Sequence, residues 1–335
     1  MKRSYRAPSG FVKRSYLVAV PLLALLVLLA LPPAALGQGL PSYRPINPVA
    51  ASRSGLSFEP YRDSHPGRWI AALAFDYAST IESNVIPGAA FVLDTELLRL
   101  RVALTRDLGP RTFVLGEAEL LGAYGGVLDG FLEWYHDLLH VPIPERERRP
   151  KNEFLYLVDV PGLGGVERKP GTLFLGDARL GLGVRVSPLL QSVVTVTLPS
   201  ATGPAGYGRG TISANLHNTV RIPVTRRLAF EAGLGAGYTP ASGSLARWQR
   251  ELAVAGSSGL RWRFWGRQSL YGNLFLQSPH YHDTTLPSLD RRELSFDFGW
   301  ILAGTRGREL RVGMTEDLEP SGPAVDLVFR IGSVF

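Results

Sequence analysis

From residue 68 onward, the dominant period of hydrophobic and polar positions along the chain is two. Apolar residues alternate with polar or small residues in one run after another, and turn residues separate the runs. In the last run, Leu327, Phe329 and Ile331 share one face, whereas Val328 and Arg330 share the other. Such alternation is typical of β-strands with two unlike faces. The pattern therefore predicts an all-β, antiparallel fold.

The lengths of the connections distinguish between the all-β architectures. Short connections alternate with longer ones, of which the longest is residues 124–172. This plan, with strands of about ten residues or more, is that of an up-and-down transmembrane β-barrel with periplasmic turns and surface loops. A secreted β-sandwich is the alternative. We predict a barrel over 68–335 with about twelve strands, at 68–82, 91–107, 111–123, 173–187, 190–200, 210–224, 226–239, 249–265, 267–279, 291–305, 308–318 and 324–335.

Residues 1–37 have the three zones of a secretory signal peptide: a basic start at 2–14, an apolar run at 17–31 and small residues at 35 and 37. The alternative is a membrane anchor, but the apolar run is shorter than the roughly 20 residues that a spanning helix requires. We therefore predict a cleaved signal peptide and export to the outer membrane of a Gram-negative bacterium. The expected partners are outer-membrane lipid and the export and barrel-assembly machinery.

Composition and charge narrow the picture further. Hydrophobic residues make up 45% of the 335 residues and charged residues 19%, below the roughly 25% of a soluble domain. The chain contains no Cys, which excludes a disulfide framework and thiolate metal sites. The formal net charge is +7, but five of the cationic residues lie in the predicted signal peptide, so the mature chain carries only +2. A nucleic-acid partner is therefore not expected.

The face of the strands that is predicted to line the barrel lumen is highly charged yet nearly balanced. It carries eight acidic and nine basic residues: Asp76, Glu117, Glu119, Asp177, Glu231, Asp297, Asp317 and Asp326, with Arg99, Arg101, Arg179, Arg185, Arg221, Arg261, Arg263, Arg311 and Arg330. They indicate either a ladder of paired charges in a closed barrel or a hydrated pathway with segregated charges. A barrel of twelve strands lies between the filled eight-stranded and the open sixteen-stranded sizes.

We favour a narrow passive channel for small solutes. The paired residues Arg99 and Arg101, and likewise Arg261 and Arg263, are the candidates for a wall that favours anions, unless Glu117 and Glu119 neutralise them. The alternative function is that of a closed barrel with a structural, assembly or adhesion role through its surface loops.

The long loop 124–172 contains a segment with apolar residues at helical spacing, bounded by glycines and prolines. This pattern predicts an amphipathic helix at 127–140 with an apolar stripe of Leu128, Phe131, Leu132, Tyr135, Leu138 and Leu139. The stripe has three placements open to it: a cap on the barrel mouth, a constriction folded into the lumen, or the headgroup boundary of the membrane. Farther along the loop, residues 154–159 are a candidate extension of the neighbouring strands.

Residues 38–67 precede the first strand and are rich in Pro, Ser and Arg. They are either a periplasmic tail or a short plug that enters the barrel. In the second case we expect Arg44 and Arg53 to pair with acidic residues of the lumen.

Several short motifs resemble a known family. They are Asn47-Pro48, then 128–131 (LDGF) and 134–136 (WYH), then 149–154 (RPKNEF), and a late 312–318 (VGMTEDL). Together they are similar to an uncharacterised family of Gram-negative outer-membrane proteins that is known only as a domain of unknown function. The resemblance covers most of the mature chain and implies a signal peptide and a barrel. It implies no catalytic or binding residue.

Neither an enzyme nor a metal site is predicted. His217 shares a strand face with Ser213 and Asn215, but the chain has no Gly-x-Ser-x-Gly nucleophile motif, so an outer-membrane lipid hydrolase is the least favoured function. His280 and His282 are too few to indicate a metal site without a second cluster of ligands. No cofactor is expected.

Overall fold

The structure is a computed structural model, which describes residues 39–139, 149–319 and 325–335. The predicted signal peptide lies outside these residues. Within them, twelve antiparallel strands close on themselves into a barrel, as the alternation predicts, and β1 closes it by pairing with β15. The strands are β1 (Trp69–Ile86), β2 (Ala89–Asp107), β3 (Thr112–Tyr124), β7 (Ala178–Arg185), β8 (Leu190–Leu198), β9 (Ser213–Pro223), β10 (Leu228–Tyr238), β11 (Leu252–Trp265), β12 (Gln268–Gln277), β13 (Glu293–Ala303), β14 (Glu309–Asp317) and β15 (Leu327–Val334).

Three shorter strands lie in the predicted loop 124–172 or just beyond it. β4 (Leu155–Val160) pairs with the start of β2, and β5 (Gly164–Arg168) pairs with β4, so residues 154–159 do extend the neighbouring strands. β6 (Gly171–Leu175) pairs with β3 next to β7. The predicted strand 173–187 is therefore split at 176–177, where the pairing with β3 is interrupted.

The register places alternate side chains on opposite faces of the wall. Asp76 pairs with Arg99 on β2 and with Arg330 on β15, and all three side chains are buried inside the barrel. One residue along, Tyr77 pairs with Phe329 on the outer face. The outer face is apolar and exposed, with Leu234 at 73% exposure. Because such large apolar surfaces are rare in contact with water, this face is the one suited to lipid.

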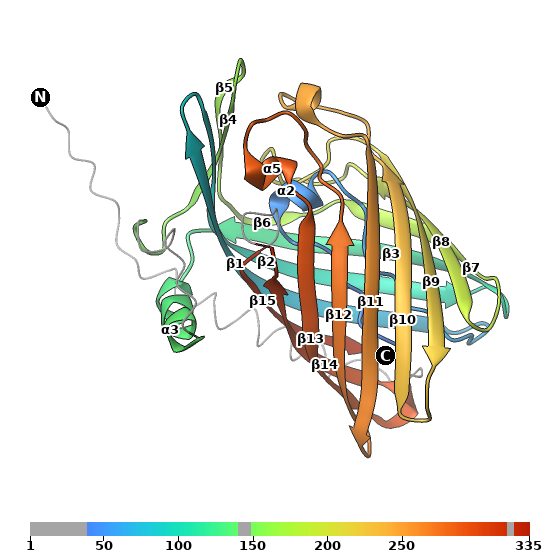
Figure 1. Cartoon of the computed structure of the whole chain (residues 1–335). Coiled ribbons are helices and arrows are strands. Elements are labelled where there is room, and N and C mark those ends of the chain that lie inside the picture. Colours follow the sequence, from blue (N-terminus) through green and yellow to red (C-terminus); the bar gives the residue numbers. More distant parts are fainter. Residues whose placement is uncertain (1–38, 140–148, 320–324) are drawn as a thin grey trace, which may run out of the picture.

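The short connections of residues 108–111, 186–189, 224–227, 266–267 and 304–308 lie at one end of the barrel, together with the C-terminal residue Phe335. We call this end the turn end and the opposite one the loop end. Figure 1 shows that the strands of the near wall, β9 to β13, cross those of the far wall, β1 to β3, at a steep angle. At the loop end, β1, β2, β4 and β5 continue past the barrel as a flat extension.

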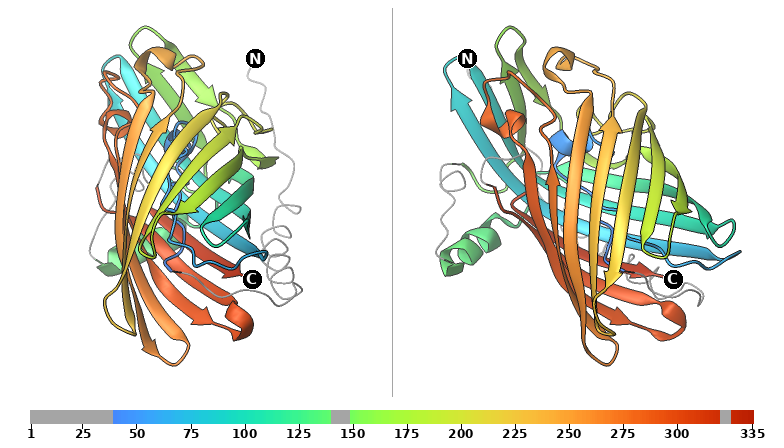
Figure 2. Two further views of the ribbon diagram at one scale, coloured as in Figure 1. Left: turned by 90° about the vertical axis from the view of Figure 1, so that its right-hand side faces the viewer. Right: turned by 45° about the vertical axis from the view of Figure 1, so that its right-hand side comes forward.

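Helices are few and short. α2 (Pro48–Ala51) lies inside the barrel, α3 (Asp129–Leu139) lies outside it, and α5 (Pro287–Asp290) lies at the loop end (Figures 1 and 2). Among the described residues, no helix has the length and apolar character that crossing a membrane requires.

Candidate functional site

Residues 39–62, which we call the plug, run inside the barrel as a hairpin. The first arm rises from the turn end, α2 forms the bend near the loop end, and the second arm returns to β1 (Figures 1 and 2). Tyr43 and Phe58 pair across the two arms through both of their backbone N–H groups, at 3.2 and 2.8 Å. The bend is specified locally, because Asn47 caps α2 by accepting from the N–H of Val49 and Pro48 occupies the first turn.

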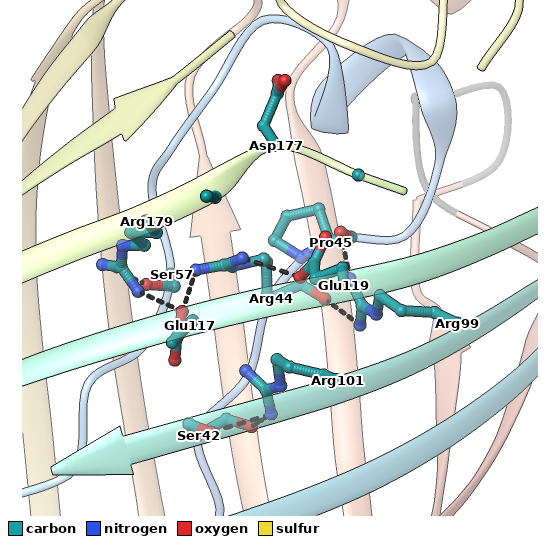
Figure 3. Close-up of polar contacts among 12 residues, drawn as sticks. Ser42, Arg44, Pro45, Ser57, Arg99, Arg101, Glu117, Glu119, Asp177 and Arg179 are labelled. Carbon is teal, nitrogen blue, oxygen red and sulfur yellow. Dashed lines mark hydrogen bonds and ion pairs between the residues drawn. The ribbon is translucent and has the colours of Figure 1, made fainter. Parts of the chain in front are cut away.

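The first arm is held by charged side chains of β2 and β3 (Figure 3). Arg44 forms ion pairs with Glu117 and, at 2.7 Å, with Glu119. Arg99 donates to the carbonyl oxygens of Pro45 and Arg44, at 2.9 and 3.0 Å. Arg101 donates to the hydroxyl of Ser42 at 2.9 Å. The expected pairing of Arg44 with acidic lumen residues is thus present in the structure.

The second arm is held by β3, β7 and the loop end of the barrel. Glu59 accepts from Arg179 at 2.6 Å, and Arg179 also contacts Glu117 at 3.1 Å. Burial alone would raise the pKa of Glu59, which belongs to no strand, but the neighbouring arginines Arg179 and Arg62 hold that pKa well below its ordinary value. Arg53 donates to the carbonyl oxygens of Thr239 and Pro240, so its expected pairing with an acidic residue is wrong.

Backbone carbonyl oxygens of the plug are the main acceptors for the wall. Side chains of the wall donate to the carbonyls of residues 39, 42, 44, 45, 54, 59, 60, 61 and 62. The donors are Arg99, Arg101, Arg185, Gln191, Arg209, Thr219, Arg221 and Arg261. The wall therefore recognises the plug through its backbone as well as through side chains such as Arg44 and Glu59.

Small residues of β10 provide the seat of the second arm. Gly233, Gly235 and Gly237 face the lumen, where a Cβ on Gly235 would stand 3.1 Å from Leu56 and one on Gly233 would stand 3.2 Å from Phe58. A larger side chain at these positions would collide with the plug. The three inward glycines that alternate with apolar residues in the sequence thus make room for two apolar plug residues.

Several buried polar groups of the wall have side-chain atoms without a hydrogen-bond partner among the described residues. They lie on β8, β9 and β12 and are Thr195, Thr197, Ser213, Asn215 and Asn273, all at most 3% exposed. Asn215 and Thr197 lie directly against Gly55 of the plug. A buried polar group without a partner costs about 1–3 kcal/mol, so this part of the wall is poorly matched to what covers it.

With the plug in place, the barrel interior is filled. The cavities between plug and wall measure about 30, 50 and 10 Å³. Since one water occupies about 10–15 Å³ by this kind of measure, these spaces hold a few waters and exclude a small organic solute.

Comparison with known proteins supports the architecture. No protein-family model matches the chain, and no curated protein sequence matches it. Among solved structures, an outer-membrane channel from Pseudomonas putida F1 is similar with a TM-score of 0.54 at 15% identity, over 83% of this chain and 98% of that one. The fold is that of an outer-membrane β-barrel.

Two further solved structures are more distant. The NanC porin has a TM-score of 0.43 at 6% identity, over 79% of this chain and 98% of that one. The toluene transporter TodX from Pseudomonas putida has a TM-score of 0.39 at 9% identity, over 81% and 89%. TM-scores below 0.5 are too low for either likeness to bear on this chain. The resemblance to a family of unknown function stays a resemblance, since no family model matches.

Most of the predicted lumen residues of this outer-membrane barrel contact either the plug or a charged residue outside it. Those that contact the plug directly are Arg99, Arg101, Glu117, Glu119, Arg179, Arg185, Arg221, Glu231 and Arg261. Other predicted lumen residues form ion pairs with residues outside the plug: Arg330 pairs with Asp76 and Asp297, Arg311 pairs with Glu309, and Asp177 pairs with Arg209. At the turn end, Arg263 donates to the carbonyl of Arg226.

Two of the predicted lumen residues lie where β14 and β15 meet the loop end. Asp326 precedes the first residue of β15 and accepts from the N–H of Ile81. Asp317, at the end of β14, accepts from the N–H of Glu319.

The arginines that were expected to form an anion-favouring wall have ion-pair and hydrogen-bond partners that the sequence did not predict. Arg99 forms its ion pair with Asp76, whereas Glu117 and Glu119 pair with Arg44 of the plug and lie close enough to Arg101 to offset part of its charge. Arg261 divides its donors between Glu309 and the carbonyl of Gly39, each at 2.8 Å. The sequence could not reveal backbone acceptors, because any residue supplies them.

Some residues of the site were not predicted as such. Glu293, which accepts from the hydroxyl of Tyr43, and Glu309 lie on the inward face, so alternation along their strands could have identified both. Glu59 and Arg209 lie outside the strands, where no periodicity assigns a face.

The observed position of the loop helix excludes two of the three placements that the sequence left open. Phe131 and Tyr135 of α3 contact Phe329 and Glu316, whose side chains lie on the outer face of the wall. The helix is therefore neither a cap on the mouth nor a constriction in the lumen. Leu132 is buried, Leu128 is half-buried and Leu138 is exposed, while the side chain of Leu139 lies outside the described part.

Of the histidines that the sequence singled out, His217 and His280 are buried and His282 is partly exposed. The Nε2 atom of His217 lies 3.0 Å from the guanidinium of Arg179, which can only donate, so His217 accepts there. His282 contacts its neighbour Asp283 at the loop end. Within the described ranges, no three acidic or His side chains are arranged to hold a metal ion.

Proposed function

We propose that this chain is an outer-membrane channel for small, oxygen-rich solutes and that the plug is its gate. The single observation that carries the proposal is the way the wall holds the plug, with a series of side-chain donors on backbone carbonyl oxygens. Water, or a solute that offers carbonyl or carboxylate oxygens, can replace such acceptors when the plug moves away. The proposal includes export to the outer membrane, assembly there by the barrel-assembly machinery and lipid around the outer face.

The buried polar groups that face Gly55 and Leu56 also support a plug that can withdraw from the barrel. Thr197 and Asn215 would gain hydrogen bonds from water in an unplugged barrel, which offsets part of the cost of withdrawing the plug. A wall whose purpose was only to hold this arm permanently would be better matched by apolar side chains of the same shape. The ion pairs of Arg44 oppose the withdrawal and keep the closed form dominant.

The same geometry favours anions among the solutes. When the plug leaves, Arg99 keeps Asp76 and Arg261 keeps Glu309, but both also regain free donors directed at the lumen. Arg101 loses its hydroxyl partner on Ser42. Glu117 and Glu119 lose Arg44 at the same time and lie beside Arg101, so Arg261 is the guanidinium group that the unplugged wall would present most openly to a passing carboxylate or phosphate.

The alternative function is a closed barrel that acts through its loops in structure, assembly or adhesion. The filled interior and the flat extension formed by β1, β2, β4 and β5 at the loop end favour this reading. A channel requires no catalytic step, and the absence of enzymatic activity stays a prediction.

Single-channel recording tests the proposal. We would compare the parent chain with Gly235→Leu, whose new side chain occupies the place of Leu56, and with Gly256→Leu, which faces lipid and has no atom closer than 3.7 Å to its new Cβ. Each protein is first shown to be folded by its heat-modifiable mobility on a gel. We expect a higher open fraction in Gly235→Leu than in the parent and Gly256→Leu. If all three are folded and silent, the closed barrel is correct and the channel is refuted.

A further inference from the structure

The helix α3 is fixed at its N-terminal end to the outer face of the first strands. The carboxylate of Glu96 on β2 accepts from the N–H of Val127, at 2.6 Å, and from that of Leu128, just before the helix. The hydroxyl of Tyr77 on β1 donates to the same carboxylate. Glu96 pairs with Ser79 on β1, and Ser79 is two residues from Tyr77 on the same strand. Residues two apart share a face of a strand, so the side chains of Glu96 and Tyr77 both lie on the outer face.

The body of the helix is fixed to the last strands. Tyr135 donates to Glu316 on β14 at 3.1 Å, and the ring of Phe131 lies 6.0 Å from that of Phe329 on β15. Phe329 in turn pairs with Tyr77 across the junction of β15 and β1. The helix therefore crosses, from the outside, the seam at which the first and last strands close the barrel.

A second apolar stripe lies along the exposed side of α3 and includes the nearby Val127, and Phe131 joins this stripe to the wall. Val127, Phe131, Trp134 and Leu138 are spaced by four, three and four residues and are 58%, 41%, 58% and 59% exposed. This spacing places Phe131, Trp134 and Leu138 on one side of α3, and Val127 lies two residues before its first residue. The polar side is separate, because Glu133 pairs with Lys151 and Asp129 accepts from the N–H of Asn152.

The surroundings identify what covers this stripe. The helix lies beside the wall (Figures 1 and 2), in contact with residues of the lipid-facing surface. Its exposed stripe continues that surface through Phe131 and Phe329. Phe329 also lines, with Phe298 and Met314, a hollow of about 630 Å³ in the wall formed by β12 to β15 and β1. The occupant of a surface that is continuous with the lipid-facing wall is lipid.

We propose that α3 is an interfacial helix whose stripe of Val127, Phe131, Trp134 and Leu138 inserts among the acyl chains of the membrane leaflet at the loop end. There it acts as a strap over the seam between β1 and β15. This proposal is independent of the channel, since it holds whether or not the barrel conducts. It explains why a loop helix with a buried apolar face has a second apolar face on its exposed side.

Single-cysteine labelling tests the insertion, and the natural chain, which contains no Cys, needs no further change. The full chain carrying Leu138→Cys or Trp134→Cys is labelled with an environment-sensitive fluorophore and folded into phosphatidylcholine vesicles that contain a lipid with a nitroxide on its acyl chain. Glu133→Cys is the matched control on the polar side of the same helix. Leu234→Cys, on the exposed outer wall, is the reference for contact with lipid.

We expect the nitroxide lipid to quench the Leu138 and Trp134 labels several-fold more than the Glu133 label and to an extent comparable with Leu234. Equal, weak quenching at 133, 134 and 138, together with quenching by aqueous iodide, would show that the stripe faces water and would overturn the proposal. Protection of the Leu138 label from both quenchers would also overturn it, because another segment or a second copy of the chain would then cover the stripe.

Discussion

Arg44 is the residue whose loss should release the plug most directly. It is the plug's ion-pair partner for two wall carboxylates, Glu117 and Glu119, and the three side chains are 6%, 3% and 11% exposed. Removing one partner of a buried ion pair costs about 3–5 kcal/mol, because the remaining charge is left uncompensated. Glu117 retains Arg179 at 3.1 Å, so we use the lower end of this range.

A loss of about 3 kcal/mol corresponds to about a hundredfold change in an equilibrium. In the Arg44→Ala variant, the carboxylates of Glu117 and Glu119 lose their plug partner. Water then solvates them better in the unplugged barrel than in the plugged one. The plugged form of the variant therefore loses stability relative to the open form by most of this amount. We expect the fraction of time that single channels spend open to rise by about two orders of magnitude. Arg44→Lys, which keeps the charge, should show a much smaller rise.

Two independent assays check this outcome. Single-channel recording reports the open fraction, and the reaction of Ser57→Cys on the second arm with a charged thiol reagent reports the exposure of the plug. Arg226→Ala, in an exposed turn, controls for the loss of a positive charge. If Arg44→Ala changes neither the open fraction nor the reactivity at position 57, then the ion pairs do not hold the plug and the reasoning fails.

Three further predictions follow from the two faces of the wall. Leu274→Arg places a charge on the lipid side and should cost about 2–4 kcal/mol near the membrane centre, so folding into vesicles followed on a gel should be impaired; unchanged folding would show that the face is wrongly assigned. Asp76→Asn leaves two buried arginines without their shared carboxylate and should lower the free energy of unfolding by about 3–5 kcal/mol, measured by guanidinium titration, whereas an unchanged midpoint would refute the ion-pair network. In the Gly235→Leu background, Arg261→Gln should shift the reversal potential in a salt gradient toward less anion preference, and no shift would remove Arg261 from the permeation path.

The architecture could be predicted from the sequence because the barrel wall is periodic. Each strand has one face toward lipid and one toward the lumen, so the alternation around Asp76 or Leu234 assigns both its secondary structure and its side. The alternation of short and long connections then supplies the topology.

The interior could not be predicted in the same way. The plug has no periodicity, and its contacts join residues far apart in the sequence, such as Arg99 and the carbonyl of Pro45. The basic residues Arg99 and Arg101 therefore resembled a free anion wall. Likewise, α3 has apolar residues on two sides, and helical spacing alone did not show which of them meets the barrel.

A reversible lock between plug and wall tests the gate most directly. The Cγ atom of Asn215 lies 3.1 Å from the position of a Cβ on Gly55, so cysteines at 55 and 215 fall within reach of a disulfide. We would record the current through Gly55→Cys/Asn215→Cys in one bilayer before and after adding a reductant. The account predicts silence while the disulfide is intact and discrete current steps after its reduction. The same current in both states would contradict the gate, and a folded protein that is silent in both states would contradict the channel itself.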